Sequence, residues 1–225
     1  MKQAYIEEYI QLSSEKMKKN FFSVPLVVGV FGALTLLGFI DYPRLRNIFA
    51  ISLLLYFFGG WVMSKSKANY SKKIFLYSGI GFLWVSVFDL IKMTLHLEKM
   101  MHLDQVKVLI AYGVGYIFIL TVVSGYQMWA LQRGRFTEAY KKKHAKMDAV
   151  LLGVMSIIPG AMLIVNSVLK YIFGAEVFYQ GLTFAASFIP FLLLYLAIPD
   201  FYIYYLIKKY HVQVERVSSD ESVGR

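Results

Sequence analysis

The sequence predicts an all-α, polytopic membrane protein, a bundle of six transmembrane helices preceded by an amphipathic surface helix. Of the 225 residues, 58% are hydrophobic and 17% are charged, which is far from the composition of soluble domains. Several uninterrupted apolar runs are about 20 residues long, the length that a helix needs to cross a bilayer core of about 30 Å. These runs also lack the polar stripe that each helix of a soluble bundle would show.

Residues 1–20 are predicted to form an amphipathic helix on the cytoplasmic surface of the membrane. The apolar and small residues of one face recur at helical spacing: Tyr5, Ile6, Tyr9, Ile10, Ser13 and Met17. Glutamates and lysines occupy the opposite face. The alternative is a solvated segment that leads into the first span.

The transmembrane domain is expected over residues 21–207. Its six spans are expected at residues 21–40, 47–63, 74–91, 108–131, 149–169 and 182–207. Residues 92–107 are a mixed-charge connection that extends the third helix beyond the bilayer. Residues 208–225 form a polar cytoplasmic tail.

Proline and small residues predict local features of these spans. Pro25 falls in the first turn of its helix, where a missing N–H is tolerated. Ala111 and Gly115 are spaced for close helix packing. The pair Pro159-Gly160 predicts a kink in the fifth span, and Pro190 and Pro199 lie inside the sixth.

The distribution of Lys and Arg predicts the orientation. Residues 1–20, 64–73, 132–147 and 208–225 together hold eighteen basic residues, whereas the alternate connections hold six. By the positive-inside rule, both termini are cytoplasmic and the protein resides in a plasma (inner) membrane. The segment 132–147 is also predicted to contact anionic lipid headgroups. Its basic residues are Arg133, Arg135, Lys141, Lys142, Lys143 and Lys146.

Ionisable residues within spans are candidates for function because charge is costly in lipid. Asp89 lies near the outer end of the third span, with Lys92 and His96 three and seven residues further along the same face. These three residues suit a polar ligand or a proton, and Asn166 and Lys170 of the fifth span are candidates for the same outer pocket. The alternative is an Asp89–Lys92 pair whose lysine reaches for headgroups.

Asp200 follows Pro199 near the cytoplasmic end of the sixth span. A proline-broken helix frees carbonyl groups, which with a carboxylate suit a cation. The alternative is an interfacial aspartate that pairs with a nearby lysine.

Other classes of protein have little support in the sequence. The basic residues form no face of a soluble domain, so nucleic acid is not an expected partner. The chain has no cysteine, and its four histidines do not have metal-ligand spacing, so we expect no catalytic residue, metal or cofactor. Two classes remain: a non-enzymatic accessory protein, such as a subunit of a membrane complex or a membrane immunity factor, and a small-solute or ion transporter or its substrate-binding subunit. An accessory protein implies a membrane protein partner or a homo-oligomer.

Overall fold

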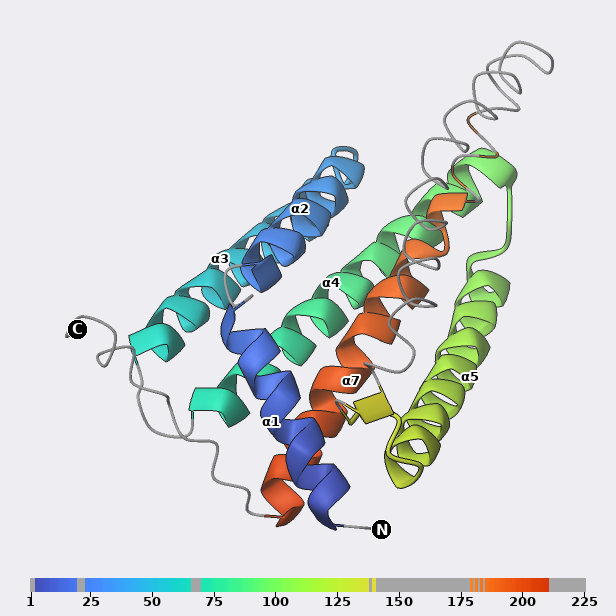
Figure 1. Cartoon of the computed structure of the whole chain (residues 1–225). Coiled ribbons are helices and arrows are strands. Elements are labelled where there is room, and N and C mark those ends of the chain that lie inside the picture. Colours follow the sequence, from blue (N-terminus) through green and yellow to red (C-terminus); the bar gives the residue numbers. More distant parts are fainter. Residues whose placement is uncertain are drawn as a thin grey trace.

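The described part of the chain is entirely helical. The computed structural model describes residues 3–19, 23–65, 70–137, 139–140, 179, 181, 183 and 185–210. Within these ranges there are six helices and no strand, which confirms the predicted all-α class (Figure 1). The helices are α1 (Gln3–Lys19), α2 (Ser23–Gly38), α3 (Pro43–Lys65), α4 (Tyr70–Met101), α5 (Gln105–Gln132) and α7 (Ile189–Tyr210).

Four of these helices are long and apolar enough to cross a membrane. The spanning stretches are Pro43–Met63 of α3, Lys72–Lys99 of α4, the whole of α5 and the whole of α7. The described part of α2 is a shorter apolar helix, Val24–Gly38. Helix α4 continues ten residues past the predicted end of its span, as its mixed-charge continuation suggested.

Helix α4 is the centre of the bundle. In its most apolar window 61% of the residues are buried, against 17% for α3 and 6% for α5. The largest core cluster joins α2, α3, α4 and α7 and includes Phe49, Phe88 and Leu193. The outer helices α3 and α5 therefore leave most of their apolar side chains exposed, including Leu54, Ile117 and Phe118.

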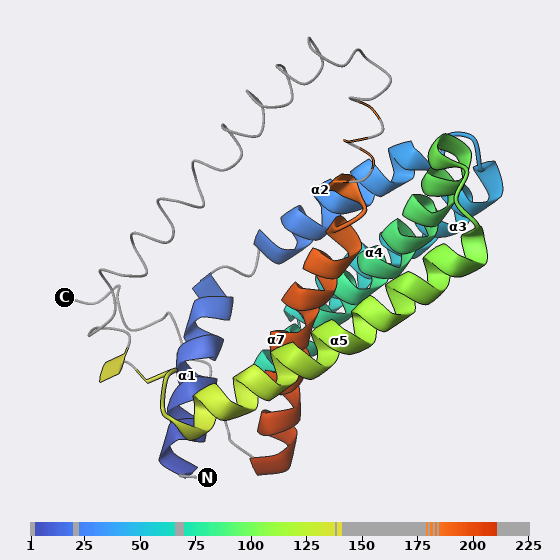
Figure 2. The same cartoon turned by 90° about the vertical axis from the view of Figure 1, so that its right-hand side faces the viewer.

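Different helix ends pack together at the two ends of the bundle. At one end, α1 packs on the beginning of α4 and on the last turns of α5 and α7 through Ile10, Phe75, Leu131 and Leu206. At the other end, the last turns of α4 pack on the first turns of α5 and α7. Helices α5 and α7 therefore run in the same direction, and α4 runs against both (Figures 1 and 2).

Helix α1 uses its apolar face to pack against protein. Ile6 and Ile10 are 1% and 0% exposed, and the ring of Tyr9 stacks on Phe136 with the centroids 4.4 Å apart. Gly134 follows α5 with φ of +65°, and a Cβ on it would lie 3.2 Å from the ring of Tyr5. The amphipathic pattern predicted the helix, but its apolar face covers the end of the bundle.

The two prolines predicted inside the sixth span both lie in α7, one in its first turn and one in its interior. A turn at residues 187–188 precedes α7, which begins at Ile189 and puts Pro190 in its first turn. Proline is tolerated there because that N–H has no intrahelical partner. At Pro199 the helix continues without a break, so only the carbonyl of Tyr195, four residues earlier, loses its helical donor.

Helices α3 and α4 approach closely because tyrosines pack against glycines. Tyr56 of α3 lies against Gly81 of α4, and Tyr77 of α4 lies against Gly60 of α3, so a Cβ on either glycine would overlap the facing ring. The two tyrosine rings stack with centroids 4.2 Å apart and 5° between their planes. Gly115 similarly admits the ring of Phe191, in agreement with the predicted close packing at this glycine.

Candidate functional site

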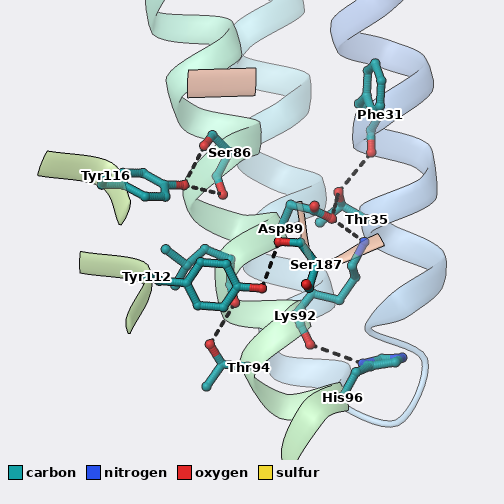
Figure 3. A network of polar contacts seen from close by, with 11 residues as sticks. Phe31, Thr35, Ser86, Asp89, Lys92, Thr94, His96, Tyr112, Tyr116 and Ser187 are labelled. Atoms are coloured by element: carbon teal, nitrogen blue, oxygen red, sulfur yellow. Dashed lines mark hydrogen bonds and ion pairs between the residues drawn. The ribbon is translucent and has the colours of Figure 1, made fainter. Parts of the chain in front are cut away.

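Asp89 and Lys92 form a buried ion pair on α4, shown in Figure 3. Their exposed fractions are 1% and 7%. Thr35 of α2 lies 3.2 Å from the same oxygen, Oδ1, that pairs with the lysine. The aliphatic part of Lys92 lies over Gly38 in the last turn of α2, where a Cβ would overlap it. The pair is thus enclosed by α2 instead of reaching outward to headgroups.

The hydrogen bonds of this pair leave one carboxylate oxygen unsatisfied. Among the described residues, Asp89 Oδ2 is buried and has no hydrogen-bond partner. The Thr35 hydroxyl has one hydrogen and two acceptors in reach, the Phe31 carbonyl at 2.9 Å and Asp89 Oδ1 at 3.2 Å. When that hydrogen is on the Phe31 carbonyl, Lys92 is the remaining donor to Asp89. A water molecule or the donor group of a polar ligand would satisfy Oδ2.

Hydroxyl groups next to this pair hold the beginning of α7. Tyr112 of α5 donates to the Ser187 carbonyl at 3.0 Å, and Ser86 of α4 donates to the Pro190 carbonyl at 2.6 Å. The Tyr116 hydroxyl lies 2.6 Å from the Ser86 hydroxyl (Figure 3). The sequence analysis did not identify these residues, although a polar side chain within an apolar span is a candidate for a hydrogen bond between helices.

His96 lies on the same helix but does not join the ion pair. Its Nδ1 is 3.1 Å from the backbone carbonyl of Lys92, one turn back on α4. The side chain therefore bonds to its own helix. The predicted trio is only partly brought together: Asp89 and Lys92 touch, and His96 contacts the backbone of Lys92.

Asp41 and Lys99 form a second, exposed ion pair that ties the α2–α3 connection to the end of α4, with Nζ and Oδ2 2.7 Å apart. The hydrogen bond and charge of Lys99 hold the pKa of Asp41 below its usual value.

A carboxyl group whose pKa is lowered by folding stabilises the folded state at pH values above its unfolded pKa of about 3.9. This stabilisation is lost as the pH falls through the folded pKa. We therefore expect Asp41→Asn to melt at a lower temperature than wild type at pH 7, and the difference to shrink as the pH falls below about 3.9. Because both groups are exposed, 0.5 M salt should shrink the difference at pH 7, and an unchanged difference would contradict a screened pair.

Asp200 lies in a second buried polar region, at the α1 end of the bundle. It is 8% exposed and faces Ser78 of α4. Burial raises the pKa of Tyr9 of α1, and the charges of Tyr202 and Asp200 raise it further. Among the described residues, the buried hydroxyls of Ser14, Tyr56 and Ser78 have no hydrogen-bond partner.

The expected pairing of Asp200 with a nearby lysine is wrong for the lysines that follow it on α7. Neither Lys208 nor Lys209 forms an ion pair with it, and Lys209 lies 5.5 Å from the ring centroid of Tyr205. Eight or nine residues of helix separate these lysines from Asp200 by roughly 12 Å along the axis. Asp200 is therefore buried among hydroxyl groups.

The remaining predicted site residues fall into two groups. Arg133 and Arg135 follow α5 and place their guanidinium carbons 5.4 Å and 4.1 Å from the ring centroid of Trp129. The others lie outside the described residues: Lys141, Lys142, Lys143, Lys146, Asn166 and Lys170. In the described ranges, no three His, Asp or Glu side chains gather as metal ligands.

The fold indicates a helical membrane protein in which the Asp89–Lys92 ion pair is enclosed between helices. Four apolar helices of spanning length and outward-facing apolar surfaces on α3 and α5 support that class. No protein-family model, curated protein or solved structure matches the chain.

Proposed function

We propose that this chain is a six-span integral membrane protein of accessory type, a subunit of a membrane complex or a membrane immunity factor, rather than an enzyme. Its expected partners are anionic lipid headgroups and a membrane protein, which can be a second copy of the chain. The observation that supports this proposal is that polar side chains lie between the helices, whereas apolar side chains cover the outer faces of α3 and α5. Buried polar groups such as Ser86 and Tyr112 bond helix to helix, whereas α3 and α5 present wide apolar faces.

The direction of the helices supports six spans. Helix α5 ends at the α1 end of the bundle and α7 begins at the opposite end, so a six-span arrangement needs one more crossing between them. Residues 149–169 are an apolar run long enough for one crossing. With α2 as the first span, six crossings place both termini on one side. Helix α1 then lies at that surface, across the end of the bundle.

Charge supports a cytoplasmic location for that side. The basic segments 1–20, 64–73, 132–147 and 208–225, whose described residues lie at the α1 end, together hold eighteen of the 24 Lys and Arg residues. The positive-inside rule then places both termini in the cytoplasm, with a bacterial-type plasma membrane as the site.

Cysteine labelling tests this topology because the chain has no native cysteine. We expect Tyr42→Cys and His102→Cys to react with an impermeant maleimide in intact cells. Ser66→Cys and Thr137→Cys should react only after permeabilisation. Labelling of the latter two sites but not the first two in intact cells would reverse the orientation, and labelling of all four from outside would contradict the span count.

A transporter, or the substrate-binding subunit of one, is the second candidate because Asp89 Oδ2 is buried without a hydrogen-bond partner among the residues that the structure describes. A buried acceptor of this kind would bind the donor group of a polar solute. The accessory proposal instead treats the ion pair as part of the helix packing.

Thermal unfolding in detergent against a panel of solutes and ions separates the two candidates. A ligand that binds only the folded state stabilises it by about 2.7 kcal/mol at a hundredfold excess over its dissociation constant. The accessory proposal predicts no shift with any solute, and a discrete protein adduct from a photocrosslinker at Phe118 of α5 or Leu54 of α3. A solute shift that Asp89→Asn abolishes would favour the transporter, and lipid adducts alone from both faces would contradict the accessory role.

A further inference from the structure

The turn that follows α5 holds two arginines against one tryptophan. Arg133 and Arg135 place their guanidinium carbons 5.4 Å and 4.1 Å from the centroid of the Trp129 ring, and Arg135 also lies 5.7 Å from that of Tyr140. Both distances to Trp129 are within the range of a cation–π contact. The flat guanidinium group is suited to stacking of this kind, which fixes its orientation.

The backbone of the turn sets this arrangement before any ligand binds. Arg133 N–H donates to the Trp129 carbonyl at 3.1 Å, and Arg135 N–H donates to the Ala130 carbonyl at 2.9 Å. Gly134, between the two arginines, has φ of +65°, a value that favours glycine. The chain therefore folds back on the last turn of α5 and brings both arginines to the same indole.

The two arginines have like charges and no acidic partner among the described residues. The two ion pairs there are Asp89–Lys92 and Asp41–Lys99. An anion that bridges two neighbouring guanidinium groups removes their repulsion and accepts charge-assisted hydrogen bonds from both. Phosphate suits this geometry because its oxygens can accept paired N–H bonds from arginine.

We propose that Trp129, Arg133 and Arg135 form a binding site for the phosphate of an anionic phospholipid. The source of the phosphate follows from the position of the site, at the end of the apolar span Gln105–Gln132. A tryptophan at the end of a span lies at the level of the headgroups. This inference rests on the proposed placement of the chain in a membrane.

Lipid binding at this site also acts on α1. The turn that carries the two arginines carries Gly134, which packs on Tyr5, and Phe136, which stacks on Tyr9. A headgroup that orders the turn therefore stabilises the packing of α1 on the bundle. Amide exchange of residues 3–19 reports this effect separately from overall stability.

The test measures thermal unfolding of the full chain in phosphatidylcholine micelles doped with increasing phosphatidylglycerol. We expect phosphatidylglycerol to raise the melting temperature of wild type and to slow amide exchange in α1. The double variant Arg133→Gln/Arg135→Gln should need about tenfold more phosphatidylglycerol for the same shift. Arg44→Gln/Arg46→Gln, which removes the same charge from exposed positions at the other end of the bundle, should respond like wild type.

Four outcomes would overturn the proposal. An equal loss in both double variants would show a general charge effect, and a wild-type response from Arg133→Lys/Arg135→Lys would show that the stacked guanidinium geometry is irrelevant. An equal shift with glycerol phosphate in solution would make this a site for soluble anions. If cysteine labelling confirms the spans but phosphatidylglycerol changes nothing, the lipid site fails while the membrane placement stands.

Discussion

Replacing Lys92 with methionine is expected to destabilise the protein by about 3–5 kcal/mol, the largest effect we predict for one substitution. The substitution keeps most of the side-chain volume but removes the charge that pairs with Asp89, which is 1% exposed. Oδ2 of Asp89 already lacks a partner among the described residues. The carboxylate would keep the Thr35 hydroxyl as its donor, and its short side chain cannot reach water.

Asp89→Asn should cost less than Lys92→Met, about 1–3 kcal/mol, although it breaks the same pair. The asparagine amide still bonds to Thr35. The freed lysine also has a long stem beside Gly38, the last residue of α2, so its ammonium group can move toward the membrane surface. A larger loss of stability in Lys92→Met than in Asp89→Asn would therefore show that Asp89 is enclosed, as well as that it pairs with Lys92.

The double variant Asp89→Asn/Lys92→Met provides the control. Replacement of both partners of a buried ion pair is often nearly neutral, because no uncompensated charge remains. We expect it to recover most of the stability lost in Lys92→Met, as measured by reversible denaturation in detergent. Two single variants within about 0.5 kcal/mol of wild type would show that the pair does not hold the helices together.

The sequence could predict that Asp89 and Lys92 meet, because residues three apart lie on one helix face. It could not predict their burial. That burial depends on Thr35 and Gly38 of α2, which lie more than fifty residues earlier in the chain. The spacing of charged residues along one helix carries no information about which other helix covers them.

Helix α1 shows the same limit. Its periodicity predicted an amphipathic helix, and α1 covers Gln3–Lys19. An apolar face has the same sequence pattern whether lipid or protein covers it. Here Ile6 and Ile10 pack on Leu131 and Leu206 from distant parts of the chain. Four of the predicted spans coincide with helices long enough to cross a membrane, because span length follows from bilayer thickness, whereas the contacts between helices required the structure.

Gly81→Ala is expected to destabilise the α3–α4 interface by about 1–3 kcal/mol. A Cβ at this position would overlap the hydroxyl and ring of Tyr56, which is held in a parallel stack with Tyr77. The ring cannot rotate away without losing the stack, so α3 must move outward. Gly113→Ala on α5 is the matched control, because a Cβ there meets nothing within 4 Å. We expect that variant to be neutral or slightly more stable, since alanine favours helix more than glycine does.

A second substitution tests whether the Tyr56 contact is the cause. The Tyr56 hydroxyl is buried and has no hydrogen-bond partner among the described residues, so Tyr56→Phe alone should not destabilise the protein. Combined with Gly81→Ala, it removes the nearest overlapping atom and should restore part of the loss. The coupling between the two positions should be about 0.5–3 kcal/mol in a double-mutant cycle.

Tyr77→Phe distinguishes this explanation from a general loosening of the tyrosine stack. The Tyr77 hydroxyl donates to the backbone carbonyl of Tyr56 at 3.2 Å, so its removal should cost a hydrogen bond, about 0.6 kcal/mol within a helical membrane protein. It should not rescue Gly81→Ala, because Tyr77 packs on Gly60 instead. If Tyr77→Phe restores the stability of Gly81→Ala as much as Tyr56→Phe does, then overlap with Tyr56 is not the cause of the lost stability. A rescue confined to Tyr56→Phe would show that each tyrosine fits its own glycine, which fixes the register of α3 against α4.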